Sequence, residues 1–440
     1  MATGPHAADK DYARRLRWFH EARFGMFIHF GLYSMLQRGE WTMFHERIRP
    51  ADYARLARQF EPGHFDANAW ADLAHEAGMK YMVLTARHGD GFCLFDSQVS
   101  DFTSVKTAAK RDFVAAYVEA CRNAGLRVGL YYSLLDWRFP GYFEPEKHPK
   151  SAHALVQQAH DQVRELMSNY GPIDELWYDG DWIGQLGGDG PQRDIAAFWR
   201  ARELNAMVRR LQPQILINNR CGLSEDLDTP EQNIRASAPG RGWEACMTIG
   251  DAAWGYVKHS AAPKSVPQLL QNLCVTAAGE GNFLLNVGPK PDGTIRKAET
   301  KRLLEIGAWL KAHGEAIYGS QRCDLYGRND AFAHVGVWTR RGNAAYLHVF
   351  RWPSGVNPSL RAKGPAITIP LVKTRVRSAE LLATGQRLRV RQEYNGRLVL
   401  SGLPEDPPDP CVNTIKVRFA GVPESLREMD KSGWLEGKAR

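Results

Sequence analysis

Over the first half of the chain, short apolar runs rich in β-forming residues alternate with longer segments of helical periodicity. One of these segments, Asp112 to Ala124, starts with an aspartate suited to cap a helix, has one apolar face and stops at Gly125. The alternation predicts parallel strands joined by crossover helices. The predicted strands are Gly25–Gly31, Tyr81–Arg87, Arg127–Ser133, Glu175–Gly180 and Ile215–Arg220.

A sixth apolar run, Asn282–Gly288, follows a helical stretch from Val266 to Ala278, and a further helix is expected at Lys297–His313. Polar and aromatic residues gather where the apolar runs end, which favours a (β/α) barrel, regular or with its last units degraded. An open doubly wound sheet is the alternative.

After Tyr318 the pattern changes to short alternating runs separated by Gly, Pro and Asn, as in AAYLHVF and RLVLSGL. Such runs are typical of an antiparallel β-sandwich. We therefore expect an α/β barrel domain at residues 1–320 and a β-sandwich domain at residues 321–440.

Composition narrows the class of protein. The formal charge of +8 comes from scattered Lys and Arg residues that alternate with acids, so no nucleic-acid partner is indicated. Met1 to Arg15 contains no apolar stretch of signal-peptide length and no later run could span a bilayer, so a cytoplasmic protein without a membrane partner is expected. The seven cysteines form no CxxC pair and the 14 histidines no HExxH motif, so neither a disulfide framework nor a metal site is indicated.

Polar side chains recur where the predicted strands end, which is the place where barrel enzymes keep their functional groups. One buried His or Tyr alone is as often structural as functional, but recurrence on successive strands points to a site. These strand-end residues are His29, His88, Tyr131, Tyr132, Asp179 and Arg220.

Asp179 follows Trp177 and Tyr178, so a strand delivers a carboxylate among aromatic rings, a setting that suits attack on the anomeric carbon of a sugar. A helix-capping role is the structural alternative. The residues alone do not rank the candidates for a second, acid/base carboxylate, which are Glu225, Asp226, Asp228, Glu231 and Glu244.

Nine motifs in order, spread over residues 12 to 320, resemble the α-L-fucosidases of glycoside hydrolase family 29. The motifs are GMFIHFG, GEW, HGDGF, LYYSLLDW, LWYDG, INNR, WEACMT, WGY and NFLLNVGPKPDGTI.

The resemblance implies a nucleophile at Asp179 and an acid/base at Glu231 of DTPEQ, with Glu244 as the alternative acid/base or as a residue of the pocket wall. It also implies sugar-binding residues and a pocket for the C6 methyl group of fucose formed by Phe27 and Trp254. The sugar-binding residues are His29, Glu40, Trp41, His88, Tyr132, Trp177 and Arg220.

The sequence departs from the family pattern at Gly89, where a second histidine is usual, and at Gln232, where an aromatic residue often stands. The function expected from the resemblance is a retaining exo-α-L-fucosidase that needs no cofactor and acts on a fucosylated oligosaccharide or glycoconjugate. A barrel glycosidase for another sugar, such as a galactoside, and a catalytically silent fucose-binding lectin are the alternatives.

Overall fold

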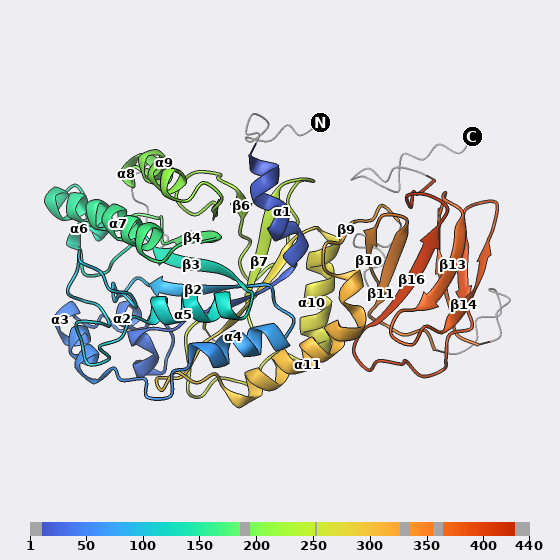
Figure 1. Ribbon diagram of the computed structural model, residues 1–440, viewed down its shortest axis with the longest axis horizontal. Coiled ribbons are helices and arrows are strands. Elements are labelled where there is room, and N and C mark those ends of the chain that lie inside the picture. Colours follow the sequence, from blue (N-terminus) through green and yellow to red (C-terminus); the bar gives the residue numbers. More distant parts are fainter. Residues whose placement is uncertain (1–10, 185–193, 251–252, 326–334, 355–363, 427–440) are drawn as a thin grey trace. The chain divides into compact units, whose positions relative to one another are not determined.

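The computed structural model describes residues 11–184, 194–250, 253–325, 335–354 and 364–426. The chain divides into two compact units, one made of residues 1–265 and 281–308 and the other of residues 266–280 and 309–440. Two eight-stranded sheets are present (Figure 1). The domain boundary expected near residue 320 stays a prediction.

The first unit contains a parallel barrel. Its strands are β1 (Phe24–Ile28), β2 (Tyr81–Arg87), β3 (Arg127–Ser133), β4 (Glu175–Asp179), β5 (Leu216–Ile217), β6 (Leu227–Asp228), β7 (Gly242–Thr248) and β8 (Asn282–Val287). The order β5-β4-β3-β2-β1-β8-β7-β6 runs around a ring, and a parallel bridge between Asn218 and Leu227 closes it. The prediction of a barrel is confirmed.

Two of these strands were not predicted from the sequence. Strand β6 has only two residues, and β7 has Glu244 in its interior, so neither presents a continuous apolar run. No helix follows β5 or β6, because residues 218–226 and 229–241 form loops and short bridges. The barrel is therefore irregular in its later units, as the sequence analysis allowed.

The helices of both units match the predicted segments closely where these were named. Helix α5 begins after Asp112, whose carboxylate accepts a hydrogen bond from the backbone of Ala115, and the chain leaves it through Gly125 at φ +69°. No helix among the described residues is long and apolar enough to cross a membrane. The α-helices are α1 (Tyr12–Ala22), α2 (Thr42–His45), α3 (Pro50–Tyr53), α4 (Ala67–Glu76), α5 (Phe113–Asn123), α6 (Pro140–Phe143), α7 (Pro149–Asn169), α8 (Ile195–Phe198), α9 (Ala201–Leu211), α10 (Val266–Ala278) and α11 (Lys297–His313), and the 3-10 helices are η1 (Leu32–Leu36), η2 (Ala54–Gln59) and η3 (Gly314–Ala316).

The barrel interior is filled by side chains that alternate along each strand. On β4 the period of two places Glu175, Trp177 and Asp179 on the same face. Gly25 on β1 leaves room for the ring of Tyr81, since a Cβ there would lie 2.4 Å from a ring atom. The interior apolar cluster is formed by Ala22, Phe27, Tyr81, Val83, Tyr131, Trp177, Cys246 and Leu284.

The second unit contains an antiparallel sheet. Its strands are β9 (Gln321–Arg322), β10 (Gly336–Arg341), β11 (Ala344–Val349), β12 (Ala366–Ile369), β13 (Val376–Leu381), β14 (Arg387–Gln392), β15 (Leu398–Ser401) and β16 (Asn413–Phe419). Residues from β10 to β16 share one apolar core around Trp338, Leu347, Leu400 and Ile415. The predicted change from a parallel to an antiparallel architecture is confirmed.

Candidate active site

A pocket with about 370 Å³ of empty space lies at the carboxyl ends of the barrel strands. This is the end of a barrel where loops from several strands can converge on one ligand. The pocket is lined by Phe27, His29, Trp41, His88, Tyr131, Trp177, Asp179, Arg220, Glu231 and Trp254. Most of the side chains expected to bind a sugar therefore meet in one cavity.

Two carboxylates share one guanidinium nitrogen in this pocket. Nη1 of Arg220 lies 2.9 Å from Oδ1 of Asp179 and 2.9 Å from Oε2 of Glu231. These two oxygens are therefore separated by no more than twice 2.9 Å. Asp179 is 19% exposed and Glu231 42% exposed, so both can meet a ligand from solvent.

The backbone brings these residues together from distant parts of the sequence. Arg220 follows β5 and is fixed by Thr229, which accepts from its Nε at 3.0 Å and from its Nη2 at 3.1 Å. Glu231 lies beside β7 because it forms a parallel bridge with Cys246. The guanidinium of Arg220 also lies over the ring of Trp177, 4.7 Å from its centre.

Tyr131, and not Tyr132, faces the pocket from β3. Tyr131 is paired in register with Trp177, and its hydroxyl donates to Oδ2 of Asp179 at 2.9 Å. Tyr132 points to the opposite face of the strand, where its hydroxyl donates to Gln162 of α7 at 2.8 Å. The assignment of Tyr132 to sugar binding is corrected: the two-residue period that places Trp177 and Asp179 inward also selects Tyr131.

Both histidines of the pocket are buried and neutral. Burial and the neighbouring His88 hold the pKa of His29 well below its ordinary value. Burial lowers the pKa of His88 to about 4, although the nearby Asp179 acts in the opposite direction. Neutral imidazoles are suited to exchange hydrogen bonds with sugar hydroxyls.

Aromatic rings form one wall of the cavity. Phe27 lies 5.1 Å from Trp177 and 5.9 Å from Trp254, measured between ring centres. Trp254 also lies 5.2 Å from the ring of His29. The two residues expected to enclose a methyl group, Phe27 and Trp254, are thus neighbours in the pocket.

Glu244 lies below the pocket and does not line it. It is fully buried, and its carboxylate accepts from Nε1 of Trp177 at 2.6 Å and from the hydroxyl of Tyr81 at 2.7 Å. It therefore supports the Trp177 ring from within the barrel. The expected place of Glu244 among the ligand-binding residues of the wall is corrected, because Trp177 lines the cavity whereas Glu244, which accepts from its indole, does not.

Glu175, at the start of β4, faces Glu244 and was not singled out in the sequence. The two buried carboxyl groups interact with each other, and neither forms a salt bridge in the described part of the chain. Burial and the facing Glu244 hold the pKa of Glu175 well above its ordinary value, which favours its protonated form. Only the inward period of β4 could have indicated this residue.

Glu40 holds the backbone of the segment that contains Trp254. Its buried carboxylate accepts from the N–H of Gly255 at 2.7 Å, and it is absent from the pocket lining. The prediction that Glu40 contacts the sugar directly is therefore corrected. Glu40 instead binds the backbone of Gly255, next to Trp254 of the pocket wall. Burial raises the pKa of Glu40, and the field of Glu231 acts in the same direction.

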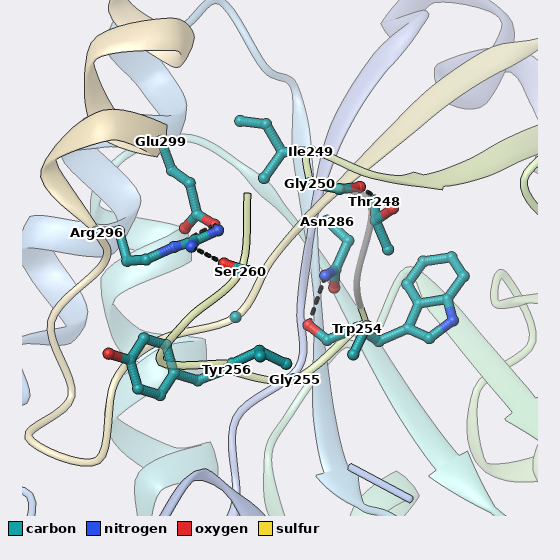
Figure 2. Close-up of a pocket in the computed structure, with 13 residues that line it drawn as sticks. Thr248, Ile249, Gly250, Trp254, Gly255, Tyr256, Ser260, Asn286, Arg296 and Glu299 are labelled. Atoms are coloured by element: carbon teal, nitrogen blue, oxygen red, sulfur yellow. Dashed lines mark hydrogen bonds and ion pairs between the residues drawn. The ribbon is translucent and has the colours of Figure 1, made fainter. Parts of the chain in front are cut away.

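Trp254 also lines a second pocket, which has about 300 Å³ of empty space (Figure 2). In it Arg296 bonds to Ser260 and pairs with the buried carboxylate of Glu299. Asn286, at the end of β8, donates to the carbonyl oxygen of Trp254 at 2.7 Å. Sequence reasoning missed Asn286, although it belongs to one of the recognised motifs.

The two departures from the family pattern have structural counterparts. A Cβ at Gly89 would lie 2.5 Å from Leu135 and 3.0 Å from Trp137, so these side chains fill the space that a histidine would need. Gln232 is not among the residues that line the pocket, and its amide donates to Thr248 on β7 at 2.9 Å. Among the described residues, no three His, Cys, Asp or Glu side chains gather as metal ligands do.

Comparison with known proteins agrees with this geometry. The chain is similar to the tissue α-L-fucosidase of Rattus norvegicus, with 32% identity over 77% of this chain and 76% of that protein. Among solved structures it is similar to α-L-fucosidase isoenzyme 1 from Paenibacillus thiaminolyticus, with 34% identity, a TM-score of 0.81, and coverage of 93% of this chain and 99% of that chain.

A further similar structure is an α-L-fucosidase from Bacteroides thetaiotaomicron, described as a trapped covalent intermediate in complex with 2-fluoro-fucosyl fluoride. It is 26% identical, with a TM-score of 0.80, and the match covers 92% of this chain and 96% of that chain. The family model for α-L-fucosidase matches residues 3–315. The chain therefore belongs to the α-L-fucosidase family of glycoside hydrolases.

Proposed function

We propose that the protein is a retaining exo-α-L-fucosidase in which Asp179 is the nucleophile and Glu231 the acid/base. The observation that carries the proposal is the position of both carboxylates on one nitrogen of Arg220, each at 2.9 Å. Retaining enzymes need carboxyl groups about 5 to 5.5 Å apart, and the upper limit set by Arg220 is compatible with that spacing.

The reaction then has two steps. A carboxylate oxygen of Asp179 attacks the anomeric carbon while protonated Glu231 gives its proton to the departing glycosidic oxygen, so a fucosyl ester of Asp179 forms. Water next attacks the same carbon, Glu231 takes a proton from it, and the ester bond to Asp179 breaks. The trapped intermediate of the Bacteroides relative supports this course.

Donors around Asp179 keep it ready for attack. Arg220 donates to one carboxylate oxygen and Tyr131 to the other, so the group is fixed in orientation. Glu231 is the more exposed of the two carboxylates, which suits a group that must meet both a leaving group and water.

Phe27 and Trp254 support fucose as the sugar. A methyl group against these rings gains about 0.8 kcal/mol from burial, whereas the C6 hydroxyl of a galactoside would find no partner there. The substrate class that fits is a fucosylated oligosaccharide or glycoconjugate.

The test is to follow hydrolysis of an aryl α-L-fucoside by proton NMR and to compare its rate with that of an aryl α-L-galactoside, which differs from it only by a hydroxyl on C6. We expect α-L-fucose as the first product anomer and a fucoside rate at least tenfold higher. The β-anomer as first product would refute the double displacement. Comparable rates for the two glycosides would refute the choice of sugar.

A further inference from the structure

The side chain of Asn286 bridges two walls of the active-site pocket. Its Oδ1 lies 2.7 Å from Nδ1 of His29, and its Nδ2 lies 2.7 Å from the carbonyl oxygen of Trp254. Asn286 and His29 are both buried, with 2% and 3% of their surface exposed. Figure 2 shows the amide directed at the Trp254 backbone.

The chemistry of the amide fixes which atom faces which neighbour. A carbonyl oxygen only accepts hydrogen bonds, so the amide atom opposite Trp254 must be the NH₂ group. The amide oxygen then faces His29, and because this oxygen also only accepts, Nδ1 of His29 must bear the hydrogen.

We infer that Asn286 is a positioning residue that locks His29 in the tautomer with hydrogen on Nδ1 and so makes Nε2 a hydrogen-bond acceptor for one sugar hydroxyl. The imidazole is neutral because burial and His88, whose ring lies 6.0 Å away, oppose its protonation. Nε2 has no partner in the described part of the chain, and the ring lines the pocket.

With this tautomer, His29 requires a sugar hydroxyl that donates a hydrogen bond, in addition to one of the right size and position. The hydroxyl that meets Nε2 must donate its hydrogen, so replacement of that hydroxyl by fluorine, which cannot donate, is as harmful as its removal. Where a sugar hydroxyl only accepts a hydrogen bond from Arg220, fluorine can still accept that bond. Replacement of such a hydroxyl by fluorine should therefore reduce hydrolysis less than its removal does. This consequence rests on the proposed function, whereas the tautomer itself does not.

The direct test is nitrogen NMR of the full-length protein labelled with ¹⁵N-histidine, at neutral pH and without ligand. We expect a protonated Nδ1 and an unprotonated Nε2 for His29 in the wild type. In Asn286→Ala the Nε2-protonated form should appear, and in Asn286→Asp a carboxylate should favour the doubly protonated ring. Hydrogen on Nε2 of wild-type His29 would overturn the inference whatever the enzyme hydrolyses.

Asn218 offers a matched control. Its amide also makes two bonds, accepting from the N–H of Tyr178 at 2.9 Å and donating to the Tyr178 carbonyl at 2.8 Å, without contacting His29. Asn218→Ala should leave the His29 resonances unchanged, and a similar change in both variants would reduce Asn286 to a structural residue.

Kinetics supply the second arm. In a series of deoxy and deoxyfluoro aryl α-L-fucosides, one ring position should lose on the order of tenfold or more in kcat/KM for both analogues, and Asn286→Ala should remove that selectivity. No such position in an active enzyme would contradict the acceptor role of His29. Absence of any fucoside hydrolysis would instead contradict the proposed function and leave the NMR result to decide the tautomer.

Discussion

The inward face of β4 has a carboxyl group at each end, and the two groups have opposite environments. Asp179 lies at the pocket, partly exposed, with a guanidinium on one oxygen and a phenol on the other. Glu175 lies at the barrel floor, fully buried, and faces another carboxyl group without a salt bridge in the described part of the chain. The strand separates them by about 13 Å.

The difference lies in how the charge is compensated. A guanidinium beside a carboxylate compensates its negative charge and fixes its orientation, which suits a nucleophile. A carboxyl group that faces another acid in a low-dielectric interior keeps its proton and acts as a hydrogen-bond donor. The chemical role of each carboxyl group of β4 is therefore set by its neighbours and not by its residue type.

The largest expected effect is at the pocket end. Asp179→Ala should lower kcat by a factor on the order of 10⁴, because no nucleophile remains, and azide should partly restore turnover as fucosyl azide. Thermal unfolding serves as the control for folding. Wild-type rates in the purified variant would remove Asp179 from the mechanism.

Glu231→Ala should follow in size. Natural fucosides need protonation of the leaving oxygen and should slow by a factor on the order of 10² to 10⁴, whereas activated aryl fucosides should slow far less. The matched control is Glu244→Ala, for which no such dependence on the leaving group is expected. The reverse pattern would move the acid/base role to Glu244.

Substitution of the buried Glu244 inside the barrel is expected to reduce stability. Glu244→Ala leaves the indole N–H of Trp177 and the hydroxyl of Tyr81 buried without an acceptor, so we expect a loss of about 2–5 kcal/mol in the free energy of unfolding. Urea denaturation measures it. Glu231→Ala, which alters an exposed side chain, should change stability by less than about 1 kcal/mol. An equal loss of unfolding free energy in Glu244→Ala and Glu231→Ala would contradict the structural role given to the buried Glu244.

The buried His88 predicts a loss of stability in acid. Its pKa is about 4 in the folded protein and about 6.5 in the unfolded chain, so its contribution is complete above pH 6.5 and is lost as pH falls toward 4. We expect His88 to lower the free energy of unfolding by about 3 kcal/mol as the pH falls over that interval. His88→Gln should show a correspondingly shallower decline in urea denaturation at pH 7 and pH 4.5, and an unchanged slope would refute a neutral, buried His88.

The smallest effect is expected for Glu175→Gln. A protonated carboxyl group and an amide both donate a hydrogen bond, so this variant should stay within about 1 kcal/mol of the wild type. Asp179→Asn makes the same chemical change at the other end of β4 and should abolish most activity, which is the contrast to measure. A destabilisation as large as that of Glu244→Ala would mean that Glu175 is ionised.

The sequence by itself determined the class of architecture and most of the pocket. Six apolar runs predicted six of the eight barrel strands. The position of polar residues at strand ends also predicted the meeting of five side chains in the pocket: His29, His88, Tyr131, Asp179 and Arg220. These inferences hold because burial dictates local pattern and parallel strands bring their ends to one rim.

Only the tertiary structure decided which side of a strand a residue faces and what lies behind the first layer. Of the two strand-end tyrosines named from the sequence, Tyr131 and not Tyr132 faces the pocket, because Tyr131 is in register with Trp177. The roles of Glu175 and Asn286 depend on partners that are distant in the sequence. Glu175 faces Glu244, and Asn286 contacts His29. Hydrogen bonds between distant segments leave no periodic mark on either segment, so local sequence determines which groups are available and the closed barrel determines their partners.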